Sequence, residues 1–296
     1  MSNIFVNLET VNNSDSPALV KVNEKRYPYV LTNPHKYLIT IDRFSLRKAW
    51  LPVFEDTNTL QVRVVRLSDS LTSTETLDFS AYTDVNNMIY DTNSFFTVLN
   101  YHLQQACSGA GLASNYPFLT NNETDGSATL DYSATNNFAT LYKIEFNEPL
   151  YCIFNSFNYT DVVFDQNFFR VTLPDVAPYT KTTADAIDLS PVDKIYIKTN
   201  SVPIIAEYTP SNNSTQKSEA ILTDFEFGGA NRFPLTHINY TSTTGHSMNE
   251  ANNFETVDLQ FYYKTFANNE FPMYMLPSGS VNVKLFFRPI RSEHTY

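Results

Sequence analysis

The clearest hydrophobic pattern lies near the end of the chain, over residues 276–289. Alternate side chains there are apolar: Val281, Val283, Leu285 and Phe287. The positions between them are mostly polar: Asn282, Lys284, Phe286 and Arg288. A period of two is typical of a β-strand that buries one face in a core. The pattern therefore predicts a long strand that belongs to a sheet buried on one side.

The same alternation recurs along the chain. Residues 257–264 repeat it, and Pro272, Pro277 and Gly279 in the following connection predict that the two strands run antiparallel. Further short strands are predicted at 36–44, 59–67, 138–146, 150–154, 167–173, 194–199, 204–208, 220–227 and 235–240. Such a series of short strands separated by turn residues predicts an all-β protein built as a β-sandwich.

One helix interrupts the strands. Apolar side chains recur along a single helical stripe: Phe95, Leu99, Leu103 and Ala106. Thr92 or Asn93 is expected to cap the first turn, and Gly109 and Gly111 to end the helix. Residues 115–137 and 175–191 are predicted to be long loops, which are uncommon unless they make contacts.

We expect three parts along the chain. Residues 1–30 are polar and weakly patterned, which predicts an extended N-terminal arm. Residues 31–290 show no internal repeat and no composition shift that marks a boundary, so we expect one domain there. Residues 291–296 are expected to form a C-terminal tail.

Charge and composition exclude several classes of function. The chain has 31 acidic and 20 basic residues and a net charge of -11, which disfavours binding to a phosphate backbone. The first residues show no features of a signal peptide, and no apolar run approaches the ~20 residues of a membrane span. We therefore expect a soluble protein, made in a cytosol or nucleus, with no nucleic-acid partner.

The sequence contains no recognisable catalytic or metal motif. The five histidines are scattered; His237 and His246 could meet across a hairpin and bind a metal, but two exposed loop residues is the favoured interpretation. Asp161 and Asp165 could form a carboxylate pair, although most such pairs are solvated turn residues. The seven glycines form no phosphate-binding loop. We therefore predict no enzyme and no cofactor.

A few single residues have two readings. Cys107 and Cys152 are expected to be free, buried thiols, since two cysteines make no disulfide framework. Trp50, the only tryptophan, is expected to fill one end of the sandwich core in preference to anchoring a partner.

Tyr262 and Phe286 place aromatic rings on the polar faces of their strands. Burial on both sides, or a subunit interface, would explain those two residues.

Several segments together resemble one protein family. They are NPHKYLITIDRFSLRKAWLPVF (33–54), MIYDTNSFFTVLNYHLQQA (88–106), IEFNEPLYCIFNSF (144–157), LTDFEF (222–227) and VDLQFYYKTFANNEFPMYMLPSGSVNVKLFFRP (257–289). In order and spacing they are similar to the minor capsid, or penton, proteins of virophages and of Polinton and Polinton-like viruses.

The resemblance implies a single jelly-roll that forms homopentamers at the fivefold vertices of an icosahedral capsid. The neighbouring partner would be a double jelly-roll major capsid protein, and the family has no catalytic motif. Tyr262 and Phe286 become candidate members of the subunit interface. The arm could reach under neighbouring capsid proteins or order against its own subunit. We hypothesise the former, because the apolar side chains of residues 4–6 need a place to bury. A carbohydrate-binding jelly-roll, lectin-like or viral attachment module, is the alternative, and a cupin-type enzyme is disfavoured because the histidines are scattered.

Overall fold

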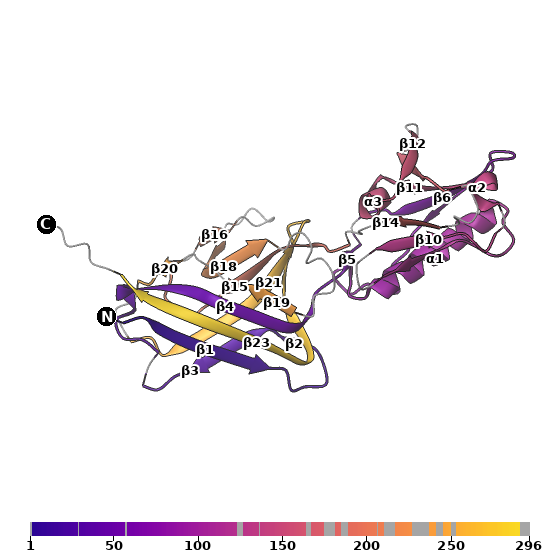
Figure 1. Ribbon diagram of the computed structural model, residues 1–296. Helices are drawn as coiled ribbons and strands as arrows, with labels where there is room; N and C mark the ends of the chain where they lie inside the picture. The colour runs from indigo at the N-terminus through magenta and orange to yellow at the C-terminus, as the bar shows by residue number, and fades with distance from the viewer. Residues whose placement is uncertain are drawn as a thin grey trace. The chain divides into compact units, whose positions relative to one another are not determined.

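The chain divides into two units, each with its own apolar core. The computed structural model (Figure 1) describes residues 2–28, 30–56, 58–122, 127–135, 137–163, 167–174, 181–184, 189–205, 207–209, 217–226, 237–240, 245–249 and 253–290. Unit 1 consists of Met1–Leu51 and Pro191–Tyr296, and unit 2 consists of Pro52–Ser190. Unit 2 is thus an insertion in the chain of unit 1.

Unit 1 contains a six-stranded antiparallel sheet, called here the first sheet. Its strands are β1 (Ile4–Val11), β2 (Ala18–Leu19), β4 (Tyr37–Trp50), β19 (His237–Tyr240), β20 (His246–Ser247) and β23 (Tyr274–Pro289). The order is β1-β23-β4-β19, while β2 also pairs with β23 and β20 with β4. A short 3-10 helix, η1 (Pro34–Lys36), precedes β4.

A five-stranded antiparallel sheet, the second sheet, faces the first. Its strands are β3 (Lys21–Lys25), β15 (Val192–Lys198), β18 (Ile221–Glu226), β21 (Thr256–Thr265) and β22 (Glu270–Pro272). The order is β18-β15-β21-β22, and β3 also pairs with β21. In Figure 1 the strands β1, β23 and β4 form one layer in front of β3 and β21. A separate hairpin joins β16 (Glu207–Thr209) and β17 (Lys217–Glu219).

The alternation in the sequence places the core of unit 1 between these two sheets. All four apolar positions predicted to face inward on β23 are buried, as are Val257, Leu259, Phe261 and Tyr263 of β21. Both sets belong to one apolar cluster. Burial of each such side chain contributes roughly 1.5–3 kcal/mol. The two strands predicted from the strongest patterns are therefore confirmed.

The N-terminal segment differs from the free arm that we expected. β1 pairs with β23 along its whole length, from Ile4 opposite Phe287 to Val11 opposite Ser280. β3 pairs with β21 in the other sheet. Val6 and Leu8 of β1 are buried in the core of unit 1. The apolar residues of this segment thus find their burial within their own subunit, because the edge of each sheet offers them a hydrogen-bonding partner.

Unit 2 contains a five-stranded antiparallel sheet with order β12-β13-β11-β6-β7. Its strands are β6 (Gln61–Arg66), β7 (Thr72–Thr76), β11 (Tyr142–Asn147), β12 (Tyr159–Val163) and β13 (Phe168–Val171). A three-stranded sheet contains β9 (Phe118–Asn121), β10 (Ala128–Asp131) and β14 (Lys181–Ala184). A two-stranded sheet contains β5 (Phe54–Glu55) and β8 (Met88–Ile89).

The predicted helix is confirmed as α1 (Thr92–Gly109), which buries its apolar stripe in the core of unit 2. Its N-cap is Asp91, one residue earlier than expected, whose carboxylate accepts from the backbone N–H groups of Asn93 and Ser94. Two short helices, α2 (Phe138–Leu141) and α3 (Glu148–Ile153), occupy segments predicted as strands. Asn147 caps α3 by accepting from the N–H of Leu150, and Pro149 fits its first turn.

The two units have separate apolar cores, which is why the chain divides where no boundary was expected between residues 31 and 290. They also differ in charge. Unit 2 contains 17 acidic and 5 basic residues, whereas unit 1 contains 14 acidic and 15 basic residues. The negative charge of the chain therefore resides in the insertion. Among the described residues, no helix is long and apolar enough to span a membrane.

Candidate assembly surface

The outer face of the first sheet presents an aromatic pair. Strand register places Phe286 of β23 opposite Phe5 of β1 and opposite Thr40 of β4, on the side away from the core. The rings of Phe5 and Phe286 stack, with centroids 4.8 Å apart and planes at 14°. Phe5 is 51% exposed, and Phe286 is half-buried. Contiguous exposed apolar surface marks protein contact sites, which makes this pair a candidate for one.

Charged side chains flank the aromatic pair. The ammonium of Lys284 lies 4.4 Å from the centre of the Phe5 ring, a cation–π contact, and 3.1 Å from the carboxylate of Asp42. We call Phe5, Asp42, Lys284 and Phe286 the outer patch. Contacts of this kind contribute up to about 1 kcal/mol each at an exposed site. The outer patch is thus an apolar centre with a polar rim and contains no reactive group.

A second aromatic contact lies at the other end of the same face. Trp50 at the end of β4 meets Tyr274 of β23 edge to face, with centroids 6.2 Å apart. Leu19 of β2 lies opposite Tyr274 and is exposed. Trp50 is half-buried and is not among the residues of the unit 1 core. The prediction that Trp50 fills one end of the core is therefore wrong. The other interpretation, in which Trp50 binds a partner, stays a prediction.

Tyr262 lies on the outer face of the second sheet. It is opposite Tyr196 of β15 and Pro272 of β22, and its hydroxyl donates to Gln260 Oε1 at 2.9 Å. The ammonium of Lys198 lies 4.7 Å from the centre of the Tyr262 ring. The two residues predicted for a subunit interface, Tyr262 and Phe286, therefore lie on different sheets. They cannot belong to one continuous face of the sandwich.

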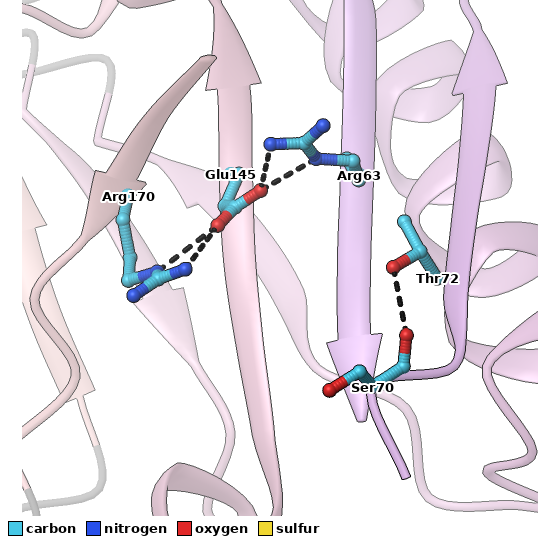
Figure 2. Close-up of polar contacts among 5 residues, drawn as sticks. All are labelled: Arg63, Ser70, Thr72, Glu145 and Arg170. Atoms are coloured by element: carbon cyan, nitrogen blue, oxygen red, sulfur yellow. Dashed lines mark hydrogen bonds and ion pairs between the residues drawn. The ribbon is translucent and has the colours of Figure 1, made fainter. Parts of the chain in front are cut away.

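Unit 2 contains a buried ionic cluster that sequence reasoning missed. Arg63 of β6 and Arg170 of β13 bind opposite oxygens of the Glu145 carboxylate on the strand between them, at 2.5 and 2.8 Å (Figure 2). The guanidinium of Arg63 also lies 3.9 Å from the centre of the Phe168 ring. Each Glu145 oxygen accepts a hydrogen bond from an arginine, so the cluster joins three neighbouring strands. The same bonds leave Glu145 unsuited to act as a general base. Nearby, the Thr72 hydroxyl donates to the Ser70 carbonyl at 3.2 Å (Figure 2).

The candidate chemical residues do not form a site in the described part of the chain. No group of three or more His, Cys, Asp or Glu side chains placed to hold a metal ion occurs among those residues. The side chains of His237 and Asp161, and all of Asp165, lie outside what the structure describes. His246 lies on β20 beside β4.

The two cysteines are free thiols, as predicted, but only one is buried. Burial raises the pKa of the Cys107 thiol to about 12. Cys152, on α3, is exposed, which corrects the expectation that both would pack as small apolar residues. A buried thiol with a raised pKa is not a nucleophile at neutral pH.

Comparison with known proteins identifies the fold. No family model matches the chain, and no curated protein matches it. The chain is similar to the selenomethionine-labelled mavirus penton protein, whose crystal structure matches it with a TM-score of 0.82. The two sequences are 25% identical, and the match covers 98% of this chain and 100% of that one. A chain in the cryo-EM structure of the Sputnik virophage has the same fold at 18% identity, with a TM-score of 0.78, over 97% of this chain and 98% of its own length.

The sandwich, its surface and these likenesses define a class. The chain is a single jelly-roll capsid protein, a structural component of a virion and not an enzyme. Within that class it is a penton protein of the virophage kind. The resemblance seen in the sequence is thereby confirmed.

Proposed function

We propose that this penton protein forms a homopentamer at the fivefold vertices of an icosahedral capsid. The likeness to the mavirus penton protein along the whole chain is the observation that supports this most directly. Tyr262 and Phe286 add support, because they lie on different sheets. A cyclic ring is heterologous, so each subunit needs two different complementary surfaces. We also propose that the neighbours in the shell are copies of a double jelly-roll major capsid protein, and that synthesis takes place in the host cytoplasm or nucleus.

The mass of the purified chain tests the pentamer. One chain has a mass of 33.8 kDa, and a closed ring of five would have about 169 kDa. Native mass spectrometry over a range of protein concentrations is expected to show the pentamer with no dimer or trimer series, because a ring closes cooperatively. A chain that stays monomeric at the highest concentration, or that gives a different closed ring, would contradict the proposal. Neither solved structure that it resembles is described as a carbohydrate-binding protein, so that alternative gains no support.

A further inference from the structure

We infer that His102 of α1 is a pH-sensitive switch inside unit 2. When its ring takes up a proton, it stops accepting a hydrogen bond from the backbone of Asp78 and donates to carboxylates instead. The consequence is a local release of residues 78–82, the segment that follows β7. The inference concerns unit 2 alone and does not depend on the proposed pentamer.

The two nitrogens of His102 have different surroundings. The side chain is 12% exposed. Its Nε2 accepts from the backbone N–H of Asp78 at 3.1 Å. A ring nitrogen that accepts a hydrogen bond carries no proton, so the neutral ring holds its proton on Nδ1. Nδ1 is buried and has no hydrogen-bond partner among the described residues; it lies 3.7 Å from Glu75 Oε2.

Protonation makes this arrangement impossible, because both nitrogens of a charged imidazole are donors. The Nε2–H group would then face the N–H of Asp78, donor against donor. Carboxylates are at hand for both donors: Glu75 beside Nδ1, and the side chain of Asp78. Hydrogen bonds from Ser80 lower the pKa of the Asp78 carboxyl, and the charge of a protonated His102 lowers it further. Asp78 therefore stays charged while the ring takes up its proton.

The charged groups around His102 are acidic. Glu75 comes from β7 and Asp78 from the segment after it. Asp56 is the next carboxyl along: burial raises its pKa, and the charge of Asp78 raises it further. On α1 itself, Tyr101 meets the ring edge to face, with centroids 5.1 Å apart.

The other strands that pack on α1 are β6, β8 and β9, and their side chains in the core of unit 2 are apolar. One basic residue of β6, Arg66, approaches the helix, but it does so at Gly111, beyond the last turn, and it is paired with Asp69. In the described part of unit 2, a protonated His102 thus meets carboxylates on both sides and no cation.

The hydrogen bond to His102 fixes residues 78–82 to another element. Within the described chain, the other hydrogen bonds of these residues stay within residues 78–83. Phe79 is buried and stacks on Phe95 of α1, with ring centroids 5.4 Å apart. This apolar packing remains when the hydrogen bond is lost. Protonation should therefore open the segment locally and leave unit 2 folded.

Hydrogen exchange of the full-length chain tests the switch. Exchange of the histidine C2 hydrogen, followed by mass spectrometry, measures the protonation of His102. Amide exchange of peptides that cover residues 77–82, corrected for its intrinsic pH dependence, measures local opening. Between about pH 8 and about pH 5, where histidines change charge, we expect the ring to become protonated. Amide exchange should rise about threefold to tenfold in step with that protonation, because one hydrogen bond is lost.

Three variants separate the switch from other effects of acid. His102→Gln is the matched variant, since the Gln Oε1 can take the place of Nε2 and accepts at every pH; its exchange in residues 77–82 should not rise in acid. His35→Gln replaces an exposed histidine of unit 1 and should behave as the wild type does. Glu75→Gln should move the opening to lower pH, because it removes a carboxylate that stabilises the charged ring.

A wild-type chain whose amide exchange in residues 77–82 stays constant while His102 is protonated would overturn the inference. Equal opening of the wild type and His102→Gln in acid would also overturn it, since the carboxylates would then be the cause. If His102→Gln is already open at the upper pH, the two exchange measurements on the wild type decide alone. Neither readout needs a pentamer, so a monomeric chain would contradict the proposed function and leave this inference standing.

Discussion

Phe286 of the last strand stacks on Phe5 of the first strand, with ring centroids 4.8 Å apart. This contact joins residues that are far apart in the sequence, and it does so on the side of the sheet away from the core. The segment that was expected to be a free arm is thereby part of the surface that we assign to assembly.

Replacing the outward ring should separate assembly from folding. Phe286→Ser removes the stacked pair but no core side chain, so we expect it to cost the monomer only about 1–2 kcal/mol. The pentamer should be lost or strongly weakened in native mass spectra. The matched control is the next residue: Phe287 is fully buried, and Phe287→Ser should cost several kcal/mol, about as much as a Phe-to-Ala change in a core. A Phe286→Ser chain that unfolds would show that Phe286 belongs to the core.

Deletion of residues 1–25 should now prevent folding of unit 1. It removes β1 and β3, with the buried side chains of Val6, Leu8, Val20 and Val22. At roughly 1.5–3 kcal/mol for each of these, the loss approaches the whole stability of a typical domain. Circular dichroism and hydrogen exchange of the purified fragment measure this. A deletion chain that retains cooperative unfolding and protected amides in β21 and β23 would contradict it and restore the free-arm interpretation.

The ionic cluster of unit 2 should be essential to its stability. Glu145→Gln leaves Arg63 buried beside a neutral amide, and we expect a loss of about 3–5 kcal/mol, because an uncompensated buried charge is costly. Urea unfolding of the wild type and the variant measures it. The control is Glu75→Gln, whose side chain is about a third exposed, and it should change stability by less than about 1 kcal/mol. Equal, small effects of the two substitutions would show that the cluster is not a clamp.

Asp258 should make unit 1 less stable in acid. Burial raises the pKa of its carboxyl, but hydrogen bonds from Ser201, Thr199 and the backbone of Asn200 outweigh burial and leave the pKa below its usual value. A carboxyl with a lowered pKa in the folded state stabilises fully above its unfolded pKa and loses this contribution as pH falls below it.

The measurement compares the thermal midpoints of the wild type and Asp258→Asn from about pH 6 to about pH 3. At the highest pH the wild type should have the higher thermal midpoint. The difference between the two midpoints should shrink as the pH falls and the Asp258 carboxyl is protonated. A difference that stays constant over the whole range would show that the hydrogen bonds do not depend on the charge of Asp258.

The sequence predicts those elements whose pattern is local. The alternation in residues 257–264 and 276–289 and the helical stripe from Phe95 to Ala106 all appear where they were predicted. The short helices α2 and α3 were missed, since four to six residues are too few to show a helical period. The cap at Asp91 was missed by one residue, because several neighbouring side chains there can accept the same N–H groups.

Contacts between residues that are far apart in the sequence could not be predicted from local patterns. Nothing local shows that Phe5 meets Phe286, or that Arg63, Glu145 and Arg170 lie on neighbouring strands. The alternation identified Phe286 and Tyr262 as outward residues, but only the strand order shows that they lie on opposite faces. One signal of the insertion lies in the sequence itself: the acidic residues are concentrated between residues 52 and 190.

The position of this chain in the virion is the most direct test of the account. An icosahedral reconstruction of particles that contain it should show five copies around each fivefold axis, into whose density the sandwich of unit 1 fits. Phe286 and Tyr262 should lie at contacts between adjacent copies. Density for this chain away from the fivefold axes would contradict its proposed role at the vertex, and a fivefold ring in which neither residue touches a neighbouring copy would contradict their predicted place in the subunit interface.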